Sequence, residues 1–142
     1  MEYNAPFFRL YEAFFLKLKG ELGKKGIEIW QNVMRDALIT AYTKSGAKRL
    51  GGVDEFIKYV GERDRSVGLK VTFEKNDKGF IYRFHTDPFP GLKGKTNWKH
   101  LVEAYLAVKK DFFLGSEWEY TTTKHIWDGN PYTEHIFVKN TP

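Results

Sequence analysis

Arg83, His85 and Asp87 stand at alternating positions at the end of a stretch that is typical of a β-strand. Side chains two residues apart share a strand face, so Arg83 and His85 are expected to point the same way. A guanidinium can hold a ligand carboxylate through two parallel hydrogen bonds. An imidazole can act as a general base, because its ordinary pKa lies near neutrality. The sequence predicts a polar site here; the alternative is a surface arginine beside a histidine that Asp87 satisfies.

The closing hairpin, residues 118–137, carries a second set of reactive side chains. Thr123 and His125 share one strand face, and across the turn His125 falls within a residue or two of Glu134 or His135. The register is left open by the sequence. If the faces match, two imidazoles and a carboxylate converge, which suits a divalent metal or a hydroxyl–imidazole–carboxylate relay. The same residues also suit an ordinary antiparallel strand pair.

Aromatic residues make up 17% of the chain, a high share. Large rings build cores, and they also line pockets for small molecules. We therefore expect a pocket between the helices and the sheet, with polar contacts from Arg83, His85, His125 and His135. The other side chains expected at the ligand are Phe84, Trp118, Tyr120, Thr123, Trp127 and Tyr132.

Helical periodicity dominates the first half of the chain. Apolar residues recur at helical spacing from Phe7 to Leu22, after a capping Asn4, and again from Ile27 to Ala41. Glycines at positions 23 and 26 are expected to bracket a break between these two helices. A shorter helix follows the glycine pair at 51–52, with its apolar face from position 53 to 60. A short loop between the first two stripes indicates an antiparallel helix pair.

Strand periodicity takes over after Gly68. Residues 69–74 and 80–85 alternate apolar and polar side chains, and Asn-Asp-Lys-Gly between them is a typical hairpin turn. A fourth, long helix is expected from Trp98 to Phe112, capped by Asn97, and a second hairpin closes the chain. The sequence thus predicts one α+β domain spanning residues 1–142. Its N-terminal helices precede an antiparallel sheet of about four strands, in two hairpins separated by a long helix.

Composition narrows the classes of partner. The chain of 142 residues has no cysteine and a net charge of +5, which excludes disulfides, thiolate nucleophiles and cysteine-based zinc sites. The basic pairs, among them Lys109-Lys110, are interpreted as solvated helix ends, so no nucleic-acid partner is predicted. No apolar run approaches the roughly 20 residues of a membrane span. We expect a cytoplasmic protein with no membrane partner, and the sequence leaves the cofactor unknown.

The order of elements resembles the 4-vinyl reductase-type domain and, more closely in length, the L-2-amino-thiazoline-4-carboxylic acid hydrolase-like family. The stretches that carry the resemblance are residues 83–90, 98–113 and 118–137. The resemblance implies an α+β domain, often dimeric, that uses the space between helices and sheet for small molecules. Those families commonly place cysteines near positions matched here by His85–Asp87 and Thr133, so a thiol mechanism does not carry over.

Three functions are left open. The first is a small-molecule-binding domain of this family. The second is a hydrolase of a C–N or similar bond, in which His85 or His125 activates water and Asp87 or Glu134 orients the imidazole. Its candidate catalytic residues are His85, Asp87, His125, Glu134 and His135. The third is an interaction module without catalysis, a homodimer that pairs through its aromatic first helix.

Overall fold

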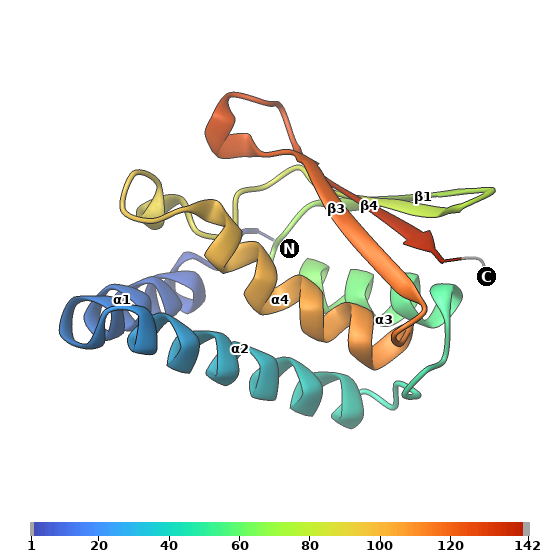
Figure 1. Ribbon diagram of the computed structural model, residues 1–142, viewed down its shortest axis with the longest axis horizontal. Helices are drawn as coiled ribbons and strands as arrows, with labels where there is room; N and C mark the ends of the chain where they lie inside the picture. Colours follow the sequence, from blue (N-terminus) through green and yellow to red (C-terminus); the bar gives the residue numbers. More distant parts are fainter. Residues whose placement is uncertain (1, 141–142) are drawn as a thin grey trace.

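Two antiparallel helices open the chain. The computed structural model describes residues 2–140, and Figure 1 shows α1 (Ala5–Leu22) and α2 (Lys24–Lys44) side by side. The side-chain oxygen of Asn4 accepts a hydrogen bond from the backbone N–H of Phe7, as the predicted cap requires. The break between the helices is narrower than expected, because Gly23 alone forms the turn with a positive φ of 58°.

Gly26 lies inside α2 and lets the two helices approach closely. A Cβ atom built at this position would come within 1.9 Å of the carbonyl oxygen of Leu18 on α1. Only a residue without a side chain fits such a contact. Further along the pair, the indole N–H of Trp30 donates to the backbone carbonyl of Tyr11 at 3.0 Å. The second glycine of the expected break is therefore a packing residue.

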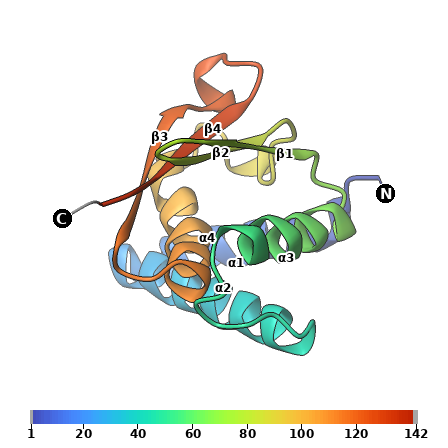
Figure 2. The same cartoon turned by 90° about the vertical axis from the view of Figure 1, so that its right-hand side faces the viewer.

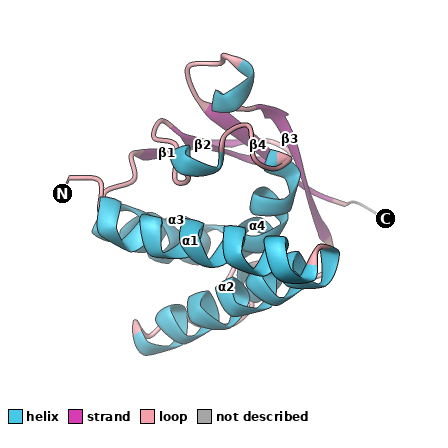
Figure 3. Ribbon diagram, turned by 90° about the vertical axis from the view of Figure 1, so that its left-hand side faces the viewer, coloured by secondary structure: helices cyan, strands magenta, loops and turns pink. Residues whose placement is uncertain are grey.

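The remaining two helices complete the helical layer. These are α3 (Val53–Ser66) and α4 (Trp98–Phe113). Asn97 caps α4 by accepting from the backbone N–H of Lys99, as predicted. In Figures 2 and 3 all four helices lie on the same side of the sheet, and α4 runs between α2 and the strands. More than half of the residues of α4 are buried, because it packs against helices and sheet at once.

Four antiparallel strands form the sheet. They are β1 (Val71–Asn76), β2 (Gly79–Phe84), β3 (Trp118–Lys124) and β4 (Thr133–Lys139), in the spatial order β1-β2-β4-β3. The two predicted hairpins thus join through their second strands, β2 and β4. Short 3₁₀ helices, η1 (Pro90–Leu92) and η2 (Ile126–Asp128), occupy the connections. The α+β class and its order of elements agree with the sequence prediction.

Strand register decides which side chains reach the core. Tyr82 pairs with His135 and Arg83 with Glu134. Since neighbours along a strand point to opposite faces, Tyr82 and His135 face the helices, whereas Arg83 and Glu134 lie on the outer face. The inner face is aromatic; Phe80, Tyr82, Phe84 and Phe137 are all buried there. Within residues 2–140, no helix has the length and apolar character needed to cross a membrane.

The close approach at Gly26 generates a stability prediction. Gly26→Ala should destabilise the protein by several kcal/mol, because the new methyl group meets the backbone of α1 and the helices must separate. Gly20→Ala in α1 is the matched control, since a Cβ there meets no atom within 4 Å. That change should stabilise by about 0.4–1 kcal/mol. Urea unfolding of both variants checks this; equal stability of the two would refute it.

Candidate functional site

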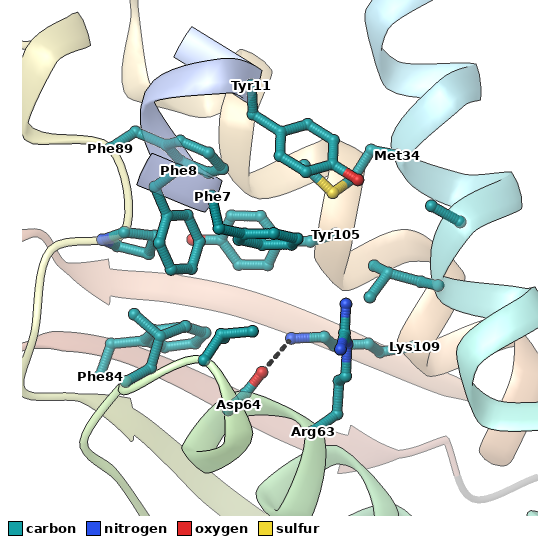
Figure 4. Close-up of a pocket in the computed structure, with 15 residues that line it drawn as sticks. Phe7, Phe8, Tyr11, Met34, Arg63, Asp64, Phe84, Phe89, Tyr105 and Lys109 are labelled. Carbon is teal, nitrogen blue, oxygen red and sulfur yellow. Dashed lines mark hydrogen bonds and ion pairs between the residues drawn. The ribbon is translucent and has the colours of Figure 1, made fainter. Parts of the chain in front are cut away.

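A pocket of about 60 Å³ lies between the helices and the inner end of the sheet. Its mouth is formed by partly exposed side chains of α1, α2 and α3, including Phe7, Ala37 and Arg63. Its walls are mostly apolar, and Figure 4 shows the rings of Phe8, Tyr11, Phe84, Phe89 and Tyr105 around it. Such an apolar concavity with a few polar groups is the usual form of a small-molecule site.

A buried ionic cluster lies at the floor of the pocket. Lys109 of α4 is 2% exposed and Asp64 of α3 is 4% exposed. The Lys109 ammonium donates to Asp64 Oδ1 at 3.4 Å and to the Tyr82 hydroxyl at 3.0 Å. The Tyr82 hydroxyl in turn donates a hydrogen bond to Asp64 Oδ2. Each carboxylate oxygen therefore has a donor, as a buried charge requires.

Aromatic rings surround the ammonium group. Lys109 Nζ lies 5.1 Å from the ring centre of Tyr105, 5.3 Å from Tyr82 and 5.4 Å from Phe84. The negative faces of such rings attract a cation. Burial nevertheless lowers the pKa of Lys109, although the charge of Asp64 opposes this. Burial, reinforced by Asp64, raises the pKa of Tyr82 well above its ordinary value. The floor of the pocket is thus a polar group of perturbed acidity inside an aromatic wall.

His135 lies behind the pocket wall and does not line it. It is fully buried, with its ring centre 5.6 Å from Phe84 and 6.4 Å from Tyr105. Its Nδ1 is 2.9 Å from the hydroxyl of Thr122, whereas Nε2 has no hydrogen-bond partner among residues 2–140. Burial, together with the positive charge of Lys109, lowers the pKa of His135 to about 3. His135 is accordingly a neutral core residue at physiological pH.

The outer face of the sheet carries a separate polar network. Arg83 Nε donates to Glu134 Oε2 at 2.7 Å, and the Thr123 hydroxyl donates to Glu134 Oε1 at 2.8 Å. Partial burial would raise the pKa of Glu134, but these two hydrogen bonds lower it below its ordinary value. Exposed His85 lies 2.8 Å from the hydroxyl of Thr72 and packs edge-on against Tyr132. The hydrogen-bonding groups of these side chains are thus paired with one another on the outer face of the sheet.

His125 belongs to a third environment, at the tip of the closing hairpin. Its ring stacks on Trp98 at the start of α4, with centres 4.7 Å apart, and Nδ1 accepts from the backbone N–H of Trp127. The Trp127 indole N–H donates to Asp87 at 2.7 Å. Burial lowers the pKa of His125, although Asp87 and Asp128 oppose this. The imidazole serves to dock the hairpin on α4.

The expected convergence of histidines does not occur. His85 lies on the outer face, His135 on the inner face and His125 at the hairpin tip, because strand parity and a bulge separate them. Neither the His85–Asp87 pair nor the His125–Glu134 pair is hydrogen-bonded within residues 2–140. In that range, no group of three or more histidine or carboxylate side chains could hold a metal ion.

The residues expected to contact a ligand also lie in different parts of the structure. Phe84 lines the pocket. Trp118 and Tyr120 face inward but pack on Phe80 and Phe137, away from the pocket. The expected contacts that lie on the outer face or at the hairpin tip are Arg83, Thr123, Trp127 and Tyr132. The closing hairpin reaches this end of the sheet, since Thr133 pairs with Phe84, but none of its residues lines the pocket, which opens toward α1, α2 and α3 instead.

The sequence prediction does not include the polar residues that line this pocket. Lys109 was assigned to a solvated helix end, yet it follows Tyr105 by one helical turn and so shares its buried face. Asp64 continues the buried stripe of Phe56 and Val60 at intervals of four residues. Both charges therefore stood on apolar helix faces, which is the signal that identifies them. Arg63, which is partly exposed, lines the mouth of the pocket.

Comparison of the sequence with models of known protein families gives no match, and comparison with curated proteins gives none either. The resemblance to the L-2-amino-thiazoline-4-carboxylic acid hydrolase-like family and the 4-vinyl reductase-type domain stays a prediction.

The burial of His135 generates a pH prediction. Between pH 6.5 and about 3 the unfolded chain binds a proton on this imidazole that the folded chain does not bind. Stability must then fall as the pH falls through this range, by up to about 1.4 kcal/mol per pH unit. His135→Leu should flatten this slope in urea unfolding measured at several pH values. Some slope should persist, because the pKa of His125 is lowered too.

His85→Gln is the control for this experiment, since His85 is exposed in the folded chain. Its stability curve should run parallel to that of the wild type. If the His135→Leu curve is parallel as well, the proposed burial of a neutral imidazole is wrong.

Proposed function

We propose that this protein binds a small molecule in the pocket between its helices and its sheet. The observation that carries the proposal is the placement of Lys109 and Asp64 at the floor of a mostly apolar pocket that opens to solvent. A structural ion pair alone needs no opening beside it. An opening lined by rings, with charged groups at its floor and mouth, is suited to enclosing and orienting a ligand.

Catalysis is not required by this proposal. A C–N bond hydrolase stays a prediction, and it needs an imidazole and an orienting carboxylate at the same substrate. The histidines of this chain lie outside the pocket wall, so any water activation there would fall to other groups. Binding is the function that the pocket geometry favours. The cytoplasmic location expected from the sequence also stays a prediction.

Blocking the mouth of the pocket tests the binding function. Ala37→Phe should abolish binding, because Ala37 is an exposed mouth residue of α2 and the new ring would cover the opening. Saturation-transfer NMR with a panel of short alcohols, amides and carboxylates measures the loss. Thr40→Phe is the control, since it adds a ring to an exposed position of the same helix outside the pocket.

The outcome depends on comparing the three proteins. Binding by the wild type and Thr40→Phe, with loss in Ala37→Phe, supports the proposal. Equal binding by all three places the ligand elsewhere and contradicts it, as does the absence of any binding. Retention of the wild-type melting temperature shows that Ala37→Phe is folded.

A homodimer that pairs through α1 is the second candidate. It is supported by Leu10 and Phe14, which are 59% and 56% exposed and, with Ala13 and Lys17, border a shallow surface depression. Exposed large apolar side chains grouped on one helix are a common feature of protein interfaces. Removing α1 would not test this, because Phe8 and Phe15 of the same helix are buried in the core.

Charge substitution on α1 tests the dimer without disturbing the core. Leu10→Glu and Phe14→Glu should convert a dimer into a monomer in light scattering, because each buries a charge in the interface. Leu50→Glu is the control, since Leu50 is 63% exposed but lies between α2 and α3. A wild-type protein that is monomeric at millimolar concentration would rule out this candidate.

A further inference from the structure

The charges that line the pocket leave one cation without a counter-ion. Three lining residues are of types that carry a formal charge: Arg63, Asp64 and Lys109. Asp64 forms an ion pair with Lys109, and Tyr82 completes the hydrogen bonding of that pair. Arg63 forms no ion pair with any residue in the range 2–140. The pocket therefore has a net charge of about +1, counted from these groups.

Arg63 is placed to contact a ligand rather than a neighbouring carboxylate. Its guanidinium lies 5.6 Å from the ring centre of Phe7, so the two side chains, from α3 and α1, flank the mouth. Figure 4 shows Arg63 and Lys109 projecting into the same space from different helices. The charge of Arg63 also contributes to lowering the pKa of Lys109, which places it within electrostatic reach of the floor.

The size of the pocket limits what it can enclose. An apolar cavity of about 150 Å³ holds a benzene molecule, and one water-sized group needs roughly 15 Å³. A pocket of about 60 Å³ is then too small for an aromatic ring. At about 25 Å³ per carbon group, as in the benzene cavity, it fits a short aliphatic chain of roughly two or three groups. The buried rings of Phe8, Phe84 and Phe89 offer that chain an apolar surrounding.

We propose that the ligand is a short aliphatic monocarboxylate whose carboxylate binds Arg63 at the mouth while its chain enters the aromatic pocket. This inference rests on the proposed binding function and adds the ligand class and the residue that selects it. A planar guanidinium can hold a carboxylate through two parallel hydrogen bonds. An amine of the same shape meets two cations, and a neutral amide gains no charge-assisted bond.

Three ligands of equal length separate these cases. Butyrate, butyramide and butylamine are titrated against the ¹⁵N-labelled full-length protein at neutral pH, and the amide signals of Asp64, Phe84 and Lys109 report on the pocket. Butyrate should bind at least tenfold more tightly than the other two. Arg63→Gln should weaken butyrate binding at least tenfold and leave butyramide unchanged. Arg63→Lys should lie between, since it keeps the charge but loses the planar fork.

Arg65→Gln is the matched control. It removes the same charge from the same helix, but Arg65 does not line the pocket, so butyrate affinity should stay at the wild-type value. A general effect of net charge would instead weaken binding equally in both glutamine variants and would overturn the assignment of Arg63.

The outcomes separate the inference from the function beneath it. If butyramide binds in the pocket as tightly as butyrate, or if Arg63→Gln binds butyrate like the wild type, the ligand class is wrong while the binding function stands. If none of the three compounds shifts the pocket signals, both proposals fail. Unchanged signals of residues remote from α3 show that the Arg63 variants are folded.

Discussion

The burial of the Lys109 ammonium is the constraint on which the rest of the structure depends. An ion removed from water costs several kcal/mol unless a counter-ion and hydrogen bonds replace the solvent. Asp64 and Tyr82 supply both, and they come from α3 and β2, whereas Lys109 comes from α4. The three elements must therefore meet at one point, which fixes α3 and α4 against the sheet. The surrounding aromatic rings contribute further attraction to the cation.

The pocket follows from this arrangement. Large, rigid rings pack around the ionic cluster, and where α1, α2 and α3 meet they leave an opening lined by Phe7, Ala37 and Arg63. One charge in that opening, Arg63, is not needed to neutralise Asp64. The same packing that holds the core together thus produces an apolar space with an excess positive charge at its mouth, a combination that suits an anionic ligand with an apolar chain.

The sheet separates two chemically different surfaces. Its inner face is aromatic and carries His135, and its outer face carries the network of Arg83, Glu134 and Thr123. The bulge between Thr122 and Lys124 matters here. Strand alternation already points Thr122 inward to His135 and Thr123 outward to Glu134, and the bulge places Lys124 opposite the same Glu134. Side chains that are adjacent in the sequence therefore belong to different environments, and the outer network does not share the pocket.

The sequence by itself determined the local structure. Apolar periodicity identified the helices and strands, and Asn4 and Asn97 act as the predicted caps, because these features depend only on residues a few positions apart. Tertiary structure decided the site. Lys109 meets Asp64, 45 residues away in the chain, and strand pairing placed three histidines in three environments. Pairing and burial depend on contacts between distant segments, and no local pattern contains that information.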